Sequence, residues 1–255
     1  MKNKDNFFKA DIKTNRISYG FFSKKNGFSK NNFYSLNCSL SSGDKKILVE
    51  KNILSAKKKL GLEKKKLKFT NQIHSSKVNF IDVRNYDKVI NGDGLITKDK
   101  DIVLAILTAD CAPIFIYDKK LKIISAIHSG WKGAYKGIVN NVINFLVKKG
   151  SRLNDLIAVI GPSIFQKNYE VQNTFKSKFI KKDSKSKKFF KTRRKKTYFS
   201  LNNYIYYQLK KRGVKNLEII KKNTFDPKNN FFSARRSSQN YENDYGRNIS
   251  IIMIK

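Results

Sequence analysis

The chain has 255 residues, of which 40% are hydrophobic, and its 19 phenylalanines and 12 tyrosines are enough to build a substantial packed core. No run of about 18 consecutive apolar residues occurs, which excludes a transmembrane helix, and two cysteines exclude a disulfide framework. Residues 1–16 carry scattered charges and lack the apolar segment of a secretory signal, so we expect a cytoplasmic protein that does not insert into a membrane.

The charge balance is strongly basic, with 55 Lys and Arg residues against 19 Asp and Glu residues and a net charge of +36. Such an excess is typical of proteins that bind nucleic acid or anionic surfaces, but here lysine is dispersed along the whole chain. No aromatic RNA-recognition motif, glycine-rich KH loop or zinc finger accompanies it. We therefore expect a solvated surface that binds nucleic acid only non-specifically, and a basic nucleic-acid-binding protein is the alternative of another class.

The hydrophobic pattern mixes short apolar runs with amphipathic stretches and has no regular strand–helix–strand repeat. Asp44 is the expected N-cap of the first helix. The expected apolar stripe of that helix consists of Ile47, Leu48, Ile53, Leu54 and Leu60. Strands are predicted over residues 17–23, 67–73, 78–83, 94–97, 102–107, 113–117, 123–127, 156–160, 217–220 and 249–254, and helices over 45–60, 134–149 and 201–212. This mixture favours an α+β fold, a single domain of residues 1–255 in which helices flank mixed β-sheets.

Residues 176–197 form the most biased stretch of the chain, with 12 Lys or Arg residues and one acidic residue. Runs of this kind are usually a solvated helix face or a mobile loop. The functional alternative is an anion-binding patch.

The hairpin predicted over residues 113–127 brings one cysteine and one histidine together. Pro113 fits only as the first residue of its strand, because proline cannot donate to an interior β-ladder. If residues 118–121 form a four-residue loop, Tyr117 pairs with Lys122, and the same register places Cys111 opposite His128. Directly opposite residues have Cβ atoms about 4.5–5.5 Å apart, which lets one metal ion contact both side chains.

The chain contains only two histidines, His74 and His128, and each stands near the end of a predicted strand, as Cys111 does. Two imidazoles and a thiolate have the softness that zinc prefers, and three protein ligands leave one position of a catalytic zinc site open to water. A fourth strong ligand would have to be Cys38 or a carboxylate. The alternative without a metal is a buried structural cysteine with hydrogen-bonded histidines. A second functional alternative is a Cys111 nucleophile with His128 as its base, which does not need His74.

Several motifs occur in a fixed order along the chain and together resemble one known family. They are Gln72-Ile73-His74, Asp93-Gly94-Leu95-Ile96-Thr97, Thr108-Ala109-Asp110-Cys111-Ala112-Pro113, His128-Ser129-Gly130-Trp131-Lys132-Gly133, Gly161-Pro162-Ser163-Ile164 with Tyr169-Glu170-Val171, and Phe231-Phe232-Ser233-Ala234-Arg235-Arg236 with Gly246-Arg247. The set resembles the YfiH family, formerly labelled polyphenol oxidase or laccase. The resemblance implies zinc bound by His74, Cys111 and His128, with Cys111 and His128 catalytic. Copper is less well supported, since two histidines cannot supply the clusters that several coppers need.

Members of this family are described as purine nucleoside phosphorylases with adenosine deaminase and methylthioadenosine phosphorylase activity, and some as peptidoglycan editing factors. The resemblance therefore implies an enzyme that cleaves adenosine, inosine or methylthioadenosine with phosphate and deaminates adenosine. Its partners would be a small nucleoside and phosphate. The substrate contacts would be Asn37, Gln72, Lys132 and Arg235. The alternative is a hydrolase that edits peptidoglycan precursors, with zinc hydroxide or the Cys111/His128 dyad as nucleophile.

Departures from the family pattern concern mainly its positive groups. Ile53 stands where the family has an arginine, and if that arginine binds phosphate, Lys132 or Arg235 would have to compensate. Lys132 replaces an arginine and lacks its bidentate donors, and Ala234 replaces a tyrosine. No glutamate lies two residues after His74, as it does in deaminases with a His-x-Glu signature, so the proton shuttle is unassigned.

Overall fold

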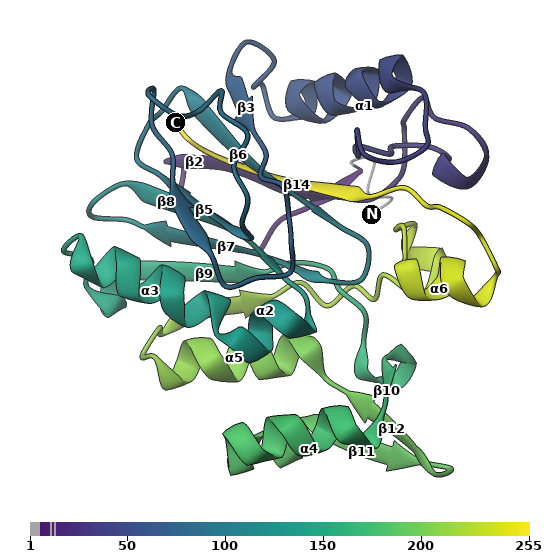
Figure 1. The fold of residues 1–255 in the computed structure, drawn as a ribbon. Helices are drawn as coiled ribbons and strands as arrows, with labels where there is room; N and C mark the ends of the chain where they lie inside the picture. Colours follow the sequence, from purple (N-terminus) through teal and green to yellow (C-terminus); the bar gives the residue numbers. More distant parts are fainter. Residues whose placement is uncertain (1–5, 11, 13) are drawn as a thin grey trace.

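The computed structural model describes residues 6–10, 12 and 14–255, and its strands form two large sheets and one small sheet (Figure 1). The five-stranded sheet consists, in spatial order, of β1 (Phe7–Phe8), β2 (Ile17–Phe22), β14 (Asn248–Ile254), β6 (Ile102–Thr108) and β3 (Lys66–Lys68). The six-stranded sheet consists of β13 (Asn216–Ile219), β9 (Leu156–Ile160), β7 (Ala112–Asp118), β8 (Ile123–Ser129), β5 (Gly94–Thr97) and β4 (Val78–Phe80). The small sheet consists of β10 (Glu170–Val171), β12 (Lys196–Phe199) and β11 (Phe190–Arg193).

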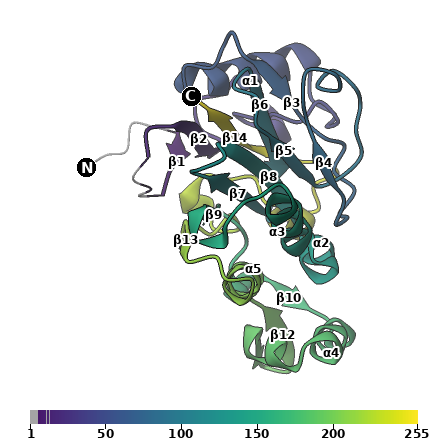
Figure 2. The same ribbon diagram turned by 90° about the vertical axis from the view of Figure 1, so that its left-hand side faces the viewer.

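The helices all lie outside the space between the two large sheets (Figure 1 and Figure 2). They are α1 (Lys46–Lys59), α2 (Trp131–Lys136), α3 (Ile138–Lys148), α4 (Asn173–Lys182), α5 (Leu201–Lys211) and α6 (Ala234–Gln239). Short 3-10 turns are η1 (Asn31–Phe33), η2 (Leu153–Asp155), η3 (Gln166–Asn168), η4 (Ser184–Phe189) and η5 (Pro227–Asn229). Figure 2 shows α1 on the five-stranded sheet and α3 and α5 beyond the six-stranded sheet, with α4 and the small sheet at the far end. Because β3, β4 and β13 pair in parallel and their neighbours mostly antiparallel, the predicted α+β fold with mixed sheets is confirmed.

The two large sheets are each buried on both faces. Along β6, Ile102 and Leu104 pack between the two sheets, whereas Val103 and Ala105 pack in the core under α1. In β7, Phe115 likewise faces the space between the sheets, and its neighbours face the helices. A strand that is covered on both faces has no solvent-facing positions, so its sequence is a continuous apolar run. This is why the central strands were predictable within one or two residues.

The first helix differs from its prediction in cap and in buried face. Lys45 occupies the N-cap position, and Asp44 does not cap the first turn. The expected apolar stripe is only partly correct: Ile53 and Leu60 pack against the core, whereas Ile47 and Leu54 are 58% and 53% exposed. The buried residues of α1 are Val49, Asn52 and Ala56. A polar side chain at the centre of the buried face breaks the hydrophobic pattern from which the stripe was inferred.

The second predicted helix, over residues 134–149, is two helices. Gly137 adopts a left-handed conformation with φ of 87°, which only glycine tolerates readily, and it separates α2 from α3. The predicted strands 67–73 and 78–83 shorten to β3 and β4, and the segment between them crosses from the five-stranded to the six-stranded sheet. Residues 176–197 are not a mobile loop, because they contain most of α4, η4, β11 and the start of β12.

Aromatic packing explains why this basic stretch is ordered. Phe179 of α4 is buried, and its ring lies 4.9 Å from that of Phe199 in β12 and 4.7 Å from that of Phe175. The lysines of the stretch therefore lie on the surface around a small aromatic core. Across the described residues, no helix combines the length and apolar character that a membrane span requires.

Asn52 of α1 is expected to stabilise the loop before the helix. Its Oδ1 accepts from the Phe28 N–H at 2.7 Å, and its Nδ2 donates to Ser29, Ser35 and Asn37. Asn52→Ala leaves buried backbone groups without partners, so we expect the free energy of unfolding to fall by about 3 kcal/mol in urea denaturation. The exposed Asn32→Ala serves as control and should change it by less than about 0.5 kcal/mol. Equal effects of the two substitutions would contradict this role.

Candidate metal centre

The β7–β8 hairpin places Cys111 and His128 on one face, in a register that differs from the prediction. Pro113, not Cys111, lies opposite His128, because the four-residue loop is residues 119–122 and not 118–121. The predicted direct pairing is therefore wrong by two residues. A shift of two preserves the face that each side chain occupies, so Cys111, which directly precedes β7, is a diagonal neighbour of His128 on the same face.

Three metal-binding side chains converge at one end of the two sheets. His74 lies in the segment that crosses from β3 to β4, Cys111 in the segment that crosses from β6 to β7, and His128 near the end of β8. Their ligand atoms all lie within 4.8 Å of one another, and the two imidazole rings are nearly perpendicular at 84°. His128 is buried whereas His74 is exposed, so the cluster opens to solvent on the His74 side. Two imidazoles and a thiolate at this spacing fit one tetrahedral ion with an open position.

Asp93 fixes two of the three candidate ligands. Its Oδ1 lies 2.7 Å from Nδ1 of His128 and accepts from the His74 N–H at 3.0 Å. Its Oδ2 accepts from both the backbone N–H and the hydroxyl of Ser75 at 2.6 Å. Burial raises the pKa of Asp93, but the hydrogen bonds from His128 and Ser75 more than offset this and hold the pKa at about 2. An ionised Asp93 holds a proton on Nδ1 of His128, so Nε2 is the nitrogen that would contact a metal, as in carboxylate–histidine–metal arrangements.

The thiol of Cys111 and the imidazole of His128 perturb each other. Burial alone raises the pKa of Cys111, but the adjacent His128 lowers it to about 7. Burial lowers the pKa of His128, whereas Cys111 and Asp93 raise it to about 9. The pair therefore favours a thiolate beside a protonated imidazole, and the thiolate is the form that binds a metal or attacks an electrophile.

Gly130 and Asp110 shape the surroundings of Cys111. A Cβ atom at Gly130 would lie 2.8 Å from Sγ of Cys111 and 3.1 Å from the His74 ring, so a side chain there would displace two candidate ligands. Asp110 has a left-handed backbone with φ of 83°, and its buried carboxylate accepts from Thr224, Ser233 and the Arg235 N–H. The turn that carries Cys111 is thereby tied to the C-terminal segment.

A polar cavity of about 280 Å³ adjoins the three candidate ligands. Besides these ligands, its walls include Ser39, Ser41, Thr70, Asn71, Gln72 and Arg247. The Arg247 guanidinium lies over the Tyr245 ring at 4.6 Å and donates to Asp244 at 3.0 Å. Hydroxyl, amide and guanidinium groups around a candidate metal suit a small, polar and partly anionic ligand.

The residues predicted to contact substrate occupy different places. Gln72 lines the cavity, but both ends of its amide bond the backbone of Leu107 in β6. Asn37 is fully buried and accepts from the Arg247 N–H, so it supports the cavity wall. Lys132 is exposed and is not among the residues that line this cavity. Arg235 donates to the Glu170 carbonyl and is likewise not among them.

Two other residues singled out from the sequence also lie apart from the candidate ligands. Ile53 packs against the core under α1, and Cys38 is buried in that same core. Cys38 does not belong to the group of potential ligands found among the described residues, so it is not a fourth ligand. Sequence reasoning missed Asp93 and Arg247 as members of the site. In the sequence, each of these two residues stands out only as part of a family motif.

The chain belongs to the family described as multi-copper polyphenol oxidoreductase laccase, whose model matches residues 18–255. The resemblance to the YfiH family is thereby confirmed. Among its relatives is a purine nucleoside phosphorylase of Rickettsia conorii, 36% identical over 188 residues that cover 72% of this chain and 77% of that protein. Purine nucleoside phosphorylase YlmD of Bacillus subtilis is 33% identical over 163 residues, which cover 60% of this chain and 59% of that one.

Two solved structures extend the likeness to the whole fold. YfiH of Bacillus licheniformis is 28% identical, with a TM-score of 0.86 and coverage of 94% of this chain and 93% of that one. YlmD of Geobacillus stearothermophilus has a TM-score of 0.89 over 100% and 98% of the two chains. At 21% identity, this likeness shows a shared fold alone. Enzymes named purine nucleoside phosphorylases are thus among the relatives of this chain.

Asp93→Asn should weaken metal binding without changing any candidate ligand. A neutral amide supports the His128 proton less well than a carboxylate and presents only one acceptor oxygen, so we expect about a 10- to 100-fold loss of zinc affinity in chelator competition. Asp87→Asn removes an exposed carboxylate and is the matched control. Indistinguishable zinc affinities of the two variants would show that Asp93 does not support the centre.

Proposed function

We propose that this protein is a zinc-dependent enzyme that cleaves purine nucleosides with phosphate and deaminates adenosine, and that its residues 1–255 act as one cytoplasmic catalytic domain. The observation that carries the proposal is the convergence of His74, Cys111 and His128 at the wall of a polar cavity. The names of the relatives from Rickettsia conorii and Bacillus subtilis support a reaction of this kind.

Zinc suits the donor set better than several coppers do. The chain has two histidines in all, and both belong to the one cluster with Cys111. His74, Cys111 and His128 would hold a single ion, which would supply Lewis-acid chemistry and lower the pKa of water in its open position. A multi-copper centre would need many more imidazoles than this chain contains.

The residues of the cavity have separable tasks in this proposal. Asp93 holds a proton on Nδ1 of His128, which keeps the ring in one orientation. The hydroxyl of Thr70 already donates to the Ile90 carbonyl and the amide of Asn71 to Asn91, so we assign their remaining hydrogen-bonding capacity to the ribose and the purine edge. Arg247 faces the same space with a guanidinium that is already oriented by Asp244, so it is the group we assign to phosphate.

Product analysis tests the reaction. The protein is incubated with adenosine, inosine or methylthioadenosine, with and without phosphate, and the products are resolved by chromatography. We expect free base with ribose 1-phosphate (or its methylthio analogue) only when phosphate is present, and inosine from adenosine without phosphate. Cys111→Ala should abolish both activities and zinc binding, whereas Cys38→Ala, which changes the other cysteine, buried in the core under α1, should keep them. Cleavage of a muropeptide precursor with no product from any nucleoside would overturn the assignment.

Arg247→Gln should separate the two activities. Because the substitution removes the positive charge assigned to phosphate, we expect kcat/KM for phosphorolysis to fall at least about 100-fold, which corresponds to about 2.7 kcal/mol. Deamination needs no phosphate and should fall far less. Arg152→Gln removes an exposed arginine outside the cavity and is the control. A parallel loss of both activities in Arg247→Gln would assign this residue to nucleoside binding or to the fold.

The Cys111–His128 pair supports a second candidate, a thiolate hydrolase acting on peptidoglycan precursors. The observation in its favour is the lowered pKa of Cys111 beside the raised pKa of His128. The two candidates differ over His74, which a metal centre needs and a dyad does not. Full activity of metal-free protein and of His74→Ala would favour the dyad, and joint loss of zinc and activity in His74→Ala would exclude it.

A further inference from the structure

A second cavity lies on the face of the six-stranded sheet that is turned away from the five-stranded sheet. There, α5 meets the small sheet. It has a volume of about 380 Å³ and lies among η3, the β11–β12 hairpin, the start of α5 and the end of β13. It shares no lining residue with the cavity at the metal centre. Its volume falls within the range of about 300–1,000 Å³ that small-molecule sites occupy.

Four cations surround this cavity without a counter-charge. Lys191 and Arg193 lie two residues apart on β11, Lys167 lies in η3 and Lys221 follows β13, and all four are exposed. In the part of the chain that the structure describes, none of them forms an ion pair with a carboxylate, and no acidic residue lines the cavity. Converging cations with this local imbalance attract an anion.

The start of α5 adds a second, independent indication of a ligand. Ser200 and Asn202 line the cavity and are only 4% and 7% exposed, yet neither side chain has a hydrogen-bond partner among the described residues. Because both residues line the cavity, their polar groups remain available to hydrogen-bond a ligand there. The helix has 11 residues and no acidic residue in its first turn, so its unpaired N–H groups and dipole add to the positive potential.

The remaining wall is mainly apolar. Phe165, Tyr198 and Ile219 line it, and the amide of Asn203 stands beside them. An aromatic wall next to amide groups suits a planar heterocycle, which stacks on the rings and bonds the amides at its edge.

We propose that this cavity is a binding site for a nucleotide, a small ligand that carries both a phosphate and a planar base, and that it is separate from the metal centre. The phosphate lies between Lys191 and Arg193 at the first turn of α5. The base lies against Phe165 and Tyr198, within reach of Asn202. The inference does not depend on the proposed reaction, because it rests on residues that the metal centre does not use.

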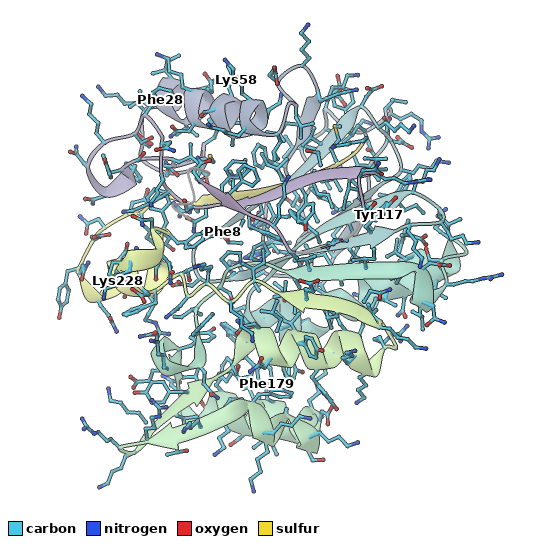
Figure 3. All side chains as sticks on the ribbon, turned by 180° about the vertical axis from the view of Figure 1, so that it is seen from behind. Phe8, Phe28, Lys58, Tyr117, Phe179 and Lys228 are labelled. Atoms are coloured by element: carbon cyan, nitrogen blue, oxygen red, sulfur yellow. The ribbon has the colours of Figure 1, made fainter. Side chains whose placement is uncertain are left out.

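Titration calorimetry of the full chain with adenosine 5′-monophosphate tests the site. Lys191→Gln/Arg193→Gln removes two of the converging cations, and we expect the Kd to rise at least about tenfold, since charge-assisted contacts to phosphate are lost. Lys51→Gln/Lys58→Gln removes the same charge from exposed positions on α1 and should change Kd less than about twofold. Figure 3 shows Lys58 at the opposite end of the molecule from Phe179 of α4, so the control lies far from the cavity.

A second pair of measurements isolates the base. Tyr198→Leu removes the ring from the wall, so the affinity for adenosine 5′-monophosphate should fall towards that for ribose 5-phosphate, whose own affinity should not change. Tyr198→Phe keeps the ring and should restore the preference for the nucleotide. Asn202→Ala should weaken binding of the nucleotide without altering the melting temperature of the protein, because the Asn202 amide has no hydrogen bond within the protein to lose.

Three outcomes would overturn the proposal. Equal losses in the cavity variant and the α1 variant would mean that binding follows bulk charge. Inorganic phosphate binding as tightly as the nucleotide would mean that no base is recognised. The third outcome is a single-stranded oligonucleotide that binds far more tightly than the nucleotide. If both charge variants weaken its binding equally, the surface binds a polymer.

Discussion

The buried carboxylate of Asp93 is the interaction on which the candidate site depends. It lies at the start of β5 and accepts hydrogen bonds from the loop that carries His74 and from the ring of His128 in β8. A carboxylate this deeply buried is stable only when it is fully bonded. Here the groups that satisfy it are the ring of His128 and the loop at His74 and Ser75. The hydrogen bonds that Asp93 requires therefore also place two of the three candidate ligands.

The pairing of two sheets explains why the ligands meet where they do. The chain passes from the five-stranded to the six-stranded sheet between β3 and β4 and again between β6 and β7, and His74 and Cys111 lie in these two crossings. Crossings emerge at the ends of strands, where backbone groups are no longer held in ladders and φ can be positive, as it is at His74 and Asp110. The rigid sheets thus hold a cluster whose members come from irregular backbone.

The sequence predicted the sheets better than the details that complete the site. Strands such as β6 and β7 are covered on both faces, and their continuous apolar runs identify them without any partner. The hairpin register was missed by two residues, since Lys122 takes a left-handed conformation that its side chain gives no reason to expect. The role of Asp93 could not be inferred from spacing, because in Asn91-Gly92-Asp93-Gly94 a carboxylate is an ordinary turn residue. Its partners lie 18 to 35 positions away along the chain and become its neighbours only in the folded sheet.

The position of Ile53 explains why α1 supplies no positive side chain at this place. Asn52 turns inward to bind the loop at residues 28–37, and Ile53 beside it packs into the core under α1, where an arginine would have to extend out of an apolar environment. Among the described residues that line the metal-centre cavity, Arg247 is the one guanidinium. Its backbone N–H is held by Asn37, and the turn at Asp110 fastens the preceding C-terminal segment. The guanidinium of this cavity therefore comes from the C-terminal segment, and the cavity walls combine residues 39–41 with residues 245–247.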